Sequence, residues 1–193
     1  MIVYEIDGAV YINLTNKCSN NCEFCVRTTS DRYEEFDLWL KKEPTAKEVI
    51  EELENHDNGR EYVFCGYGEP LCALDTLIEV ADYLKGQGKA VRLNTNGQAD
   101  LIVGKGVSER LKGKVDEVSV SLNAANAKEY NRICRCKYGE EGYYSMLRFA
   151  KECKESGIKV KFSVVNTPGF DVEAAKKVAS EQGIPLRVRE LIK

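Results

Sequence analysis

The sequence predicts an α/β fold, a partial (β/α)6 TIM-like barrel with a parallel sheet, as a single domain over residues 1–193. Six short runs rich in β-branched residues alternate with stretches of helical periodicity, which predicts parallel strands joined by right-handed crossovers. Six such units are too few for a complete eight-stranded barrel, which takes ~250 residues. We therefore expect an open barrel, with a doubly wound sheet as the alternative.

The expected strands follow one another along the chain at 9–15, 61–66, 90–95, 115–122, 158–165 and 185–191. The expected helices cover 44–56, 74–88, 126–134, 142–157 and 171–183. Pro44 suits the first turn of its helix, and the helix that begins near Leu74 ends in Gly88, as helices often do. Only 26–43 is a long connection without clear periodicity.

The composition is that of an ordinary soluble globular protein, with 43% hydrophobic and 31% charged residues. The first residues include Glu5 and Asp7 and carry no basic leader, and no apolar run approaches the ~20 residues that span a bilayer. We therefore expect a cytoplasmic protein without membrane contact, whose thiols stay reduced. The net charge of −3 argues against non-specific nucleic-acid binding.

Functional residues of parallel α/β folds lie just beyond the carboxyl ends of the strands. After the first expected strand the sequence places Cys18, Cys22 and Cys25, three thiols within eight residues. A closed zinc site needs four ligands, and the only histidine of the chain is the distant His56. In a reduced compartment such a cluster indicates metal or redox chemistry, and zinc would need Cys65, Cys72 or a distant residue as its fourth ligand.

The next three strands also end in polar, glycine-containing sequences. These are "GYGEP" at 66–70, "NTNG" at 94–97 and "SVSLNA" at 119–124. Each alone is most often a turn. Their occurrence at successive strand ends indicates one ligand site, with glycines that allow close approach and side chains that hydrogen-bond.

Together these motifs resemble the radical S-adenosylmethionine (radical SAM) superfamily from about residue 9 to the C-terminus. The spacing Cys18-x3-Cys22-x2-Cys25 resembles its cysteine signature, and "GYGEP" resembles its glycine-glutamate motif. The resemblance implies that the three thiolates hold three irons of a [4Fe–4S] cluster and that S-adenosyl-L-methionine binds the fourth. It further implies that reductive cleavage of this cofactor gives a 5′-deoxyadenosyl radical, which abstracts hydrogen from a substrate.

The resemblance also implies which residues contact the cofactor. Phe24 would flank the adenine, Asn96 and Ser121 would bind the ribose or the carboxylate end, and Arg135 would bind the carboxylate or lie on the surface. The methionine ammonium would be received by the segment that contains Gly66, Gly68 and Glu69. A catalytic residue for the substrate is not implied.

The nearest subgroup in this resemblance is the small stand-alone radical SAM proteins named for their association with TatD-type hydrolases, and a 7-carboxy-7-deazaguanine synthase type matches more weakly. A reductant such as flavodoxin or ferredoxin and a functional link to a TatD-type hydrolase are the implied partners, with an unknown substrate. The alternative is an iron–sulfur or zinc binding module without radical chemistry. Such a module would have no need of "GYGEP" or "NTNG".

Three further cysteines, Cys72, Cys134 and Cys136, follow strands of the expected site. They could hold a second cluster, bind another metal or supply a reactive thiol. We favour an inert role, because Cys134 and Cys136 would diverge on a strand or a helix. In the long connection 26–43, contact with the substrate is one interpretation for Arg27, Arg32, Tyr33 and Trp39. The other is a capping helix that packs Trp39 on the barrel.

Overall fold

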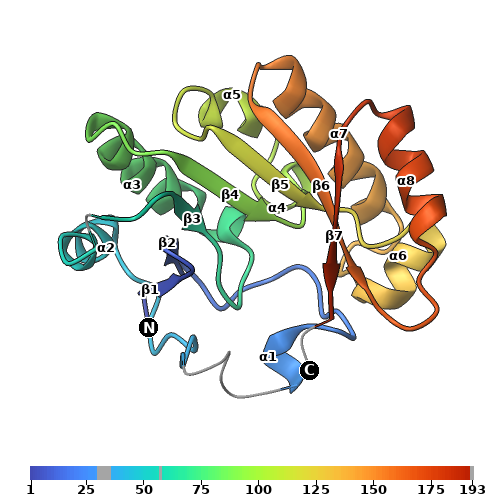
Figure 1. The fold of residues 1–193 in the computed structure, drawn as a ribbon, viewed down its shortest axis with the longest axis horizontal. Coiled ribbons are helices and arrows are strands. Elements are labelled where there is room, and N and C mark those ends of the chain that lie inside the picture. Colours follow the sequence, from blue (N-terminus) through green and yellow to red (C-terminus); the bar gives the residue numbers. More distant parts are fainter. Residues whose placement is uncertain (30–35, 57, 192–193) are drawn as a thin grey trace.

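The computed structural model describes residues 1–29, 36–56 and 58–191. Its strands form one seven-stranded sheet in the order β1-β2-β3-β4-β5-β6-β7, so that neighbours in sequence are neighbours in space (Figure 1). The strands are β1 Val3–Ile6, β2 Ala9–Ile12, β3 Tyr62–Phe64, β4 Val91–Thr95, β5 Glu117–Ser121, β6 Lys159–Asn166 and β7 Leu186–Glu190.

Strands β2 to β7 pair in parallel, which confirms the predicted six-stranded parallel sheet. The prediction missed β1, which pairs antiparallel with β2 at the sheet edge. The turn between them is Asp7-Gly8, with φ of 50° and 75°, and Asp-Gly is favoured in two-residue hairpin turns because both positions need positive φ. An Asp-Gly pair between two apolar runs was therefore the signal for this hairpin.

The helices mostly occupy the predicted stretches. They are α1 Val26–Thr29, α2 Ala46–Leu53, α3 Leu74–Gly86, α4 Ala99–Ile102, α5 Val107–Leu111, α6 Ala127–Cys134, α7 Glu141–Glu155 and α8 Val172–Glu181, with a 3₁₀ turn at Pro70–Ala73. The first turn of α2 begins after Thr45, whose side chain forms a capping box with Glu48, and not at Pro44 as expected. The prediction missed α1, α4 and α5, which are too short to show a helical period.

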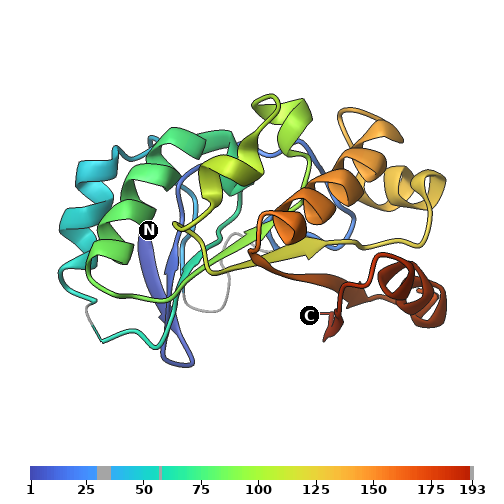
Figure 2. The same cartoon turned by 90° about the horizontal axis from the view of Figure 1, so that it is seen from above.

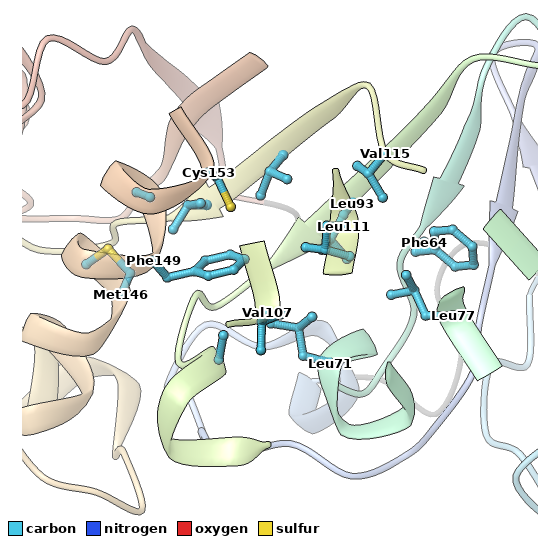
Figure 3. Packing of buried hydrophobic residues seen from close by; sticks show 14 of the residues in the cluster. Phe64, Leu71, Leu77, Leu93, Val107, Leu111, Val115, Met146, Phe149 and Cys153 are labelled. Atoms are coloured by element: carbon cyan, nitrogen blue, oxygen red, sulfur yellow. The ribbon is translucent and has the colours of Figure 1, made fainter. Parts of the chain in front are cut away.

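The hydrophobic core lies between the sheet and the helices on one of its faces. Helices α3, α5 and α7 lie on the same side of the sheet (Figure 2). Every second residue of the central strands points to them, and Leu93, Val118, Val120, Phe162 and Val164 have no exposed surface. Figure 3 shows how Phe149 and Cys153 of α7 pack into this layer. Polar residues alternate with these apolar ones and therefore lie on the opposite face.

The segment Phe36–Glu43 forms no helix in the described residues, so the expected capping helix is absent from that part. Trp39 nevertheless packs edge-on against Tyr67, with 5.1 Å between ring centroids. Arg32 and Tyr33 lie outside the described residues. Within the described part of the chain, no helix is both long and apolar enough to cross a membrane.

Candidate cofactor site at the carboxyl ends of the strands

The cysteine loop, residues 13–25, follows β2 directly and is irregular. Its three cysteines are half-buried, and none forms a disulfide with a described residue. The C-terminal end of α6 holds the loop from one side, because Asn21 N donates to Cys134 O at 2.9 Å and Glu23 N donates to Ile133 O at 3.0 Å. These carbonyls are the ones that a helix end leaves without partners, so loop and helix complete each other's hydrogen bonding.

A buried polar network holds the same loop from the side of β4. Tyr130 of α6 accepts hydrogen bonds from Asn20 Nδ2 at 3.1 Å and from Gln98 Nε2 at 2.8 Å. Gln98 Nε2 also donates to Asn20 Oδ1 at 2.8 Å. Tyr130 and Gln98 have no exposed surface, so these bonds form in a low dielectric and are costly to break.

Asn96 of the "NTNG" sequence also contacts the cysteine loop. Its Nδ2 donates to Ser19 Oγ at 2.8 Å and lies 3.9 Å from Cys18 Sγ, while its Oδ1 accepts from Gln98 N at 3.0 Å. The structure thus brings Asn96 and the first cysteine together, as the strand-end rule predicts. Its contact with a ribose stays a prediction.

Gly66 and Gly68 let the cysteine loop pack closely on the end of β3. A Cβ on Gly66 would lie 2.1 Å from Asn13 Oδ1, and one on Gly68 would lie 2.1 Å from the carbonyl oxygen of Thr15. Both distances are far below van der Waals contact. The fold of the cysteine loop itself therefore requires glycine at both positions. The sequence interpretation had explained these glycines by close approach of a ligand.

Glu69 is a buried carboxylate that ties the end of β3 to the end of β4. Its Oε1 accepts from Thr95 Oγ1 at 2.7 Å and from Leu71 N at 3.1 Å, and its Oε2 accepts from Asn96 N at 2.7 Å. Burial raises the pKa of Glu69 to about 7 in spite of these bonds. A carboxylate has about four acceptor positions, so one remains beyond the three used here.

The thiols of the triplet differ in their electrostatic surroundings. Burial raises the pKa of Cys18 to about 12, with a further contribution from the charge of Glu69. A hydrogen bond with the Cys134 thiol lowers the pKa of Cys22. Burial raises the pKa of Cys25, and the nearby positive charge of Arg27 opposes this rise. Arg27 is itself held by the loop, since its Nη2 donates to Asn20 O at 2.8 Å.

Three other predicted cofactor residues, Phe24, Ser121 and Arg135, lie at the same edge. Their contacts with described residues do not show whether they face the cofactor. Phe24 and Ser121 are half-buried, the first beside Cys25 and the second at the end of β5. Arg135 follows α6 in a left-handed conformation with φ of 45°. Its side chain is 59% exposed and lies 3.8 Å from Glu23, a cysteine-loop residue.

The additional cysteines lie in three different local surroundings. Cys134 and Cys136 are buried, while Cys72 is half-buried in the 3₁₀ turn. The Cys136 sulfur lies against α7, 2.4 Å from where a Cβ of Gly142 would be. No three Cys, His, Asp or Glu side chains of the described chain are placed to hold one metal ion. The Cys134 thiol instead contacts Cys22.

The donor set fits an iron–sulfur cluster with an organic ligand beside it. Thiolates are the ligands of such clusters, and three on one loop leave one iron without a protein ligand. The lack of a single-ion site in the described residues gives no support to zinc, whereas in a cluster each thiolate binds a different iron. Three buried acceptors at this edge, Asn13 Oδ1, Gln98 Oε1 and Asn123 Oδ1, lack a partner among the described residues. Such groups suit a ligand that donates hydrogen bonds.

A family model described as the radical SAM superfamily matches residues 12–180. The chain belongs to this superfamily. Two curated relatives from Methanocaldococcus jannaschii are a putative glycyl-radical enzyme activating enzyme, 24% identical over 78% of this chain, and a probable GTP 3′,8-cyclase, 26% identical over 94%. The chain spans 58% of the length of each.

Two solved structures share the fold of this radical SAM chain. Streptococcus suis SuiB bound to the precursor peptide SuiA has a TM-score of 0.71 and is 19% identical, with 94% of this chain and 39% of that chain covered. anSMEcpe with bound AdoMet has a TM-score of 0.70 and is 16% identical, with 95% of this chain and 51% of that chain covered. At these identities the similarity shows the fold alone.

Sequence reasoning missed the residues that support the cysteine loop. Tyr130 is 110 positions from Asn20, and Gln98 is 78 positions from it, so no local pattern joins them. Asn123 belongs to the "SVSLNA" sequence, and its φ of 52° is a strained backbone conformation just after the end of β5, which the sequence does not reveal. Gln98 stands directly after "NTNG", and this proximity was the one available signal.

Proposed function

We propose that this chain is the core domain of a radical SAM enzyme, with a [4Fe–4S] cluster on Cys18, Cys22 and Cys25. One observation carries the proposal: three half-buried cysteines occur on one loop that packs on the ends of β3 and β4 and on α6. The cluster, when bound and reduced, supplies the electron that cleaves S-adenosyl-L-methionine to a 5′-deoxyadenosyl radical. The described residues position the loop, and the strand ends around it would form the cofactor pocket.

The cofactor pocket that we propose is built from the strand ends around this loop. The unused acceptor position of Glu69 would receive the methionine ammonium together with the carbonyls of the Gly66–Gly68 segment, since opposite charges at close range favour binding. Gln98 Oε1 and Asn123 Oδ1 would accept hydrogen bonds from the adenosine. This contact is proposed because both oxygens are buried and have no partner among the described residues. Phe24, Asn96, Ser121 and Arg135 would complete the contacts.

The finer assignments are also proposals. We place the protein in the cytoplasm, as one domain over 1–193, within the small TatD-associated subgroup. A flavodoxin or ferredoxin would supply the electron, and a TatD-type hydrolase would be its functional partner. The composition and the motif pattern support these assignments. SuiB, one of the structural neighbours, binds a precursor peptide, so a peptide is one possible substrate class.

The test is anaerobic reconstitution with iron and sulfide, followed by measurement of 5′-deoxyadenosine after addition of cofactor and dithionite. We expect close to four irons per chain and formation of the product. Alanine at Cys18, Cys22 and Cys25 together should abolish both. Cys72→Ser is the matched control, because this cysteine is half-buried near the same edge and should not matter. A triple variant that keeps its irons would overturn the proposal.

A further inference from the structure

The segment 133–137, which is the end of α6 and the turn after it, pairs with the cysteine loop along its backbone. Three hydrogen bonds join the two segments: Glu23 N donates to Ile133 O at 3.0 Å, Asn21 N to Cys134 O at 2.9 Å, and Lys137 N to Ser19 O at 2.8 Å. Cys22 lies between the first two of these bonds. Its backbone is therefore fixed beside that of Cys134.

The side chains of this segment alternate between the interior and the solvent. Cys134 and Cys136 are 0% and 9% exposed, whereas Arg135 and Lys137 are exposed. Arg135 ends α6 in a left-handed conformation with φ of 45°, which is strained for a residue with a long side chain. The turn buries the Cys134 side chain in the same hydrophobic cluster against which Cys22 packs.

The hydrogen bond between the two thiols runs from Cys134 to Cys22. It lowers the pKa of Cys22 and raises the pKa of Cys134 well above its ordinary value, as expected for an acceptor and its donor. The Cys134 sulfur also accepts from Asn123 Nδ2 at 4.0 Å. A thiol carries a single hydrogen, so with Asn123 on the acceptor side this hydrogen is available to Cys22.

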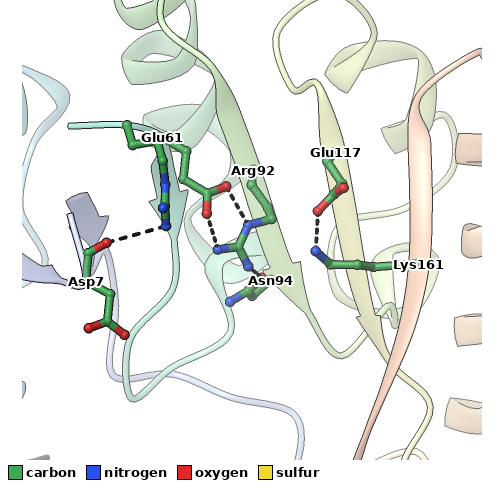
Figure 4. A network of polar contacts seen from close by, with 7 residues as sticks. Asp7, Glu61, Arg92, Asn94, Glu117 and Lys161 are labelled. Atoms are coloured by element: carbon green, nitrogen blue, oxygen red, sulfur yellow. Dashed lines mark hydrogen bonds and ion pairs between the residues drawn. The ribbon is translucent and has the colours of Figure 1, made fainter. Parts of the chain in front are cut away.

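Few charges compete with this hydrogen bond. After the bond from Cys134, the pKa of Cys22 responds to burial and to the charge of Arg27. Cations of the sheet are neutralised nearer the amino ends of β4, β5 and β6, where Figure 4 shows Arg92 with Glu61 and Lys161 with Glu117. A hydrogen bond is electrostatically stronger in such buried surroundings than in water.

We infer that Cys134 is a positioning residue that donates a hydrogen bond to the sulfur of Cys22 and thereby raises the reduction potential of the cluster. This inference rests on the proposed function, and it gives Cys134 a role that involves no metal binding. Reduction adds negative charge to a cluster and its thiolates, so a donor stabilises the reduced state more than the oxidised state. Hydrogen bonds to the sulfurs are among the factors that set such potentials. An electron would thus enter more easily.

Cys136 provides a matched control within the same segment. It is also buried, but its sulfur accepts from Tyr138 N at 3.4 Å and lies against Gly142 of α7. Cys136→Ala and Cys134→Ala remove the same atoms from positions two residues apart. A loss of packing should affect both variants, whereas the loss of a donor to Cys22 should affect only Cys134→Ala.

The experiment measures the midpoint potential of the reconstituted cluster by a redox titration followed by electron paramagnetic resonance. Cys134→Ala should lower the equilibrium constant for one-electron reduction threefold or more, which is about 28 mV or more at ~59 mV per factor of ten. Cys134→Ser should recover more than half of this shift, because a hydroxyl also donates. Cys136→Ala should keep the wild-type potential, and each variant should hold about four irons.

A second measurement tests the contact in protein without a cluster. With serine at Cys18 and Cys25, Cys22 is the one cysteine left on the loop. Diamide, an azo compound, should then join Cys22 to Cys134: two S–H bonds break, one S–S bond forms, and the azo group takes up both hydrogens. Mass spectrometry of peptides identifies the disulfide. Adding Cys134→Ser should leave Cys22 reduced, and adding Cys136→Ser should not.

Three results would overturn the inference. They are equal potentials for the wild type and Cys134→Ala, equal shifts for Cys134→Ala and Cys136→Ala, and a disulfide that joins Cys22 mainly to another cysteine. Formation of 5′-deoxyadenosine in the same preparations separates the two proposals. Normal product with equal potentials contradicts this inference alone, whereas the expected potentials without product contradict the proposed enzyme activity alone.

Discussion

Glu69 provides a test of how the ends of β3 and β4 are joined. Its carboxylate accepts from Leu71 N, Thr95 Oγ1 and Asn96 N, and it is almost fully buried. Glu69→Gln keeps the shape but replaces one acceptor oxygen with an NH₂ group. At least one backbone N–H then faces a donor, and a buried donor without a partner costs about 1–3 kcal/mol. We expect this loss of unfolding free energy at pH 8, measured by urea denaturation of the reduced protein.

The pH dependence of this effect has a definite sign. Burial raises the pKa of Glu69 from its ordinary value of 4.5 to about 7, so the folded protein holds a proton there that the unfolded chain releases. This proton stabilises the wild type fully below about pH 4.5, and the contribution is lost as pH rises through 7. Glutamine does not titrate. The difference between wild type and Glu69→Gln should therefore grow by up to about 3 kcal/mol between pH 8 and pH 4.5.

Two variants make the measurement decisive. Glu79→Gln makes the same chemical change on an exposed position of α3 and should alter stability by less than about 0.5 kcal/mol. Thr95→Val removes one donor to Glu69, and its effect should not add to that of Glu69→Gln, since both act on the same bonds. If Glu69→Gln and Glu79→Gln unfold at equal urea concentrations at both pH values, the carboxylate does not bridge the strands as described.

Two further predictions concern the surroundings of the cysteine loop. Tyr130→Phe leaves Asn20 and Gln98 without their shared acceptor and should cost about 1–3 kcal/mol of unfolding free energy, whereas Tyr144→Phe on the surface should be neutral; equal midpoints in urea would contradict the network. Serine at Cys72, Cys134 and Cys136 should leave the iron content of the reconstituted protein near four; a fall from eight to four would instead establish a second cluster.

The parallel strands were predictable because their apolar runs are bounded by turn residues, and the site could be placed because parallel strands end at one edge. The hairpin of β1 and β2 was not predicted, although Asp7-Gly8 is a typical sequence for its turn. The prediction contained only parallel strands joined by helical crossovers, which leave no place for an antiparallel pair. α5 was missed because its five residues span little more than one turn.

The supports of the candidate site were less predictable for a different reason. Gly66 and Gly68 were assigned to ligand contact, but what requires them is close approach of Asn13 and Thr15, which no spacing in the sequence reveals. The bond between Glu69 and Asn96 likewise depends on how β3 and β4 end in space. Local sequence thus indicated which residues are special, whereas the contacts that make them so come from tertiary packing.

The central claim is that the cysteine loop presents a cluster with one iron open to S-adenosyl-L-methionine. The most direct measurement is electron–nuclear double resonance on the reduced, reconstituted protein with cofactor labelled with ¹⁵N at its methionine amino group. The account predicts a ¹⁵N coupling to the cluster that is absent without cofactor and absent from the variant with alanine at Cys18, Cys22 and Cys25. A cluster that is fully formed and reduced, yet shows no ¹⁵N coupling at saturating cofactor, would contradict it.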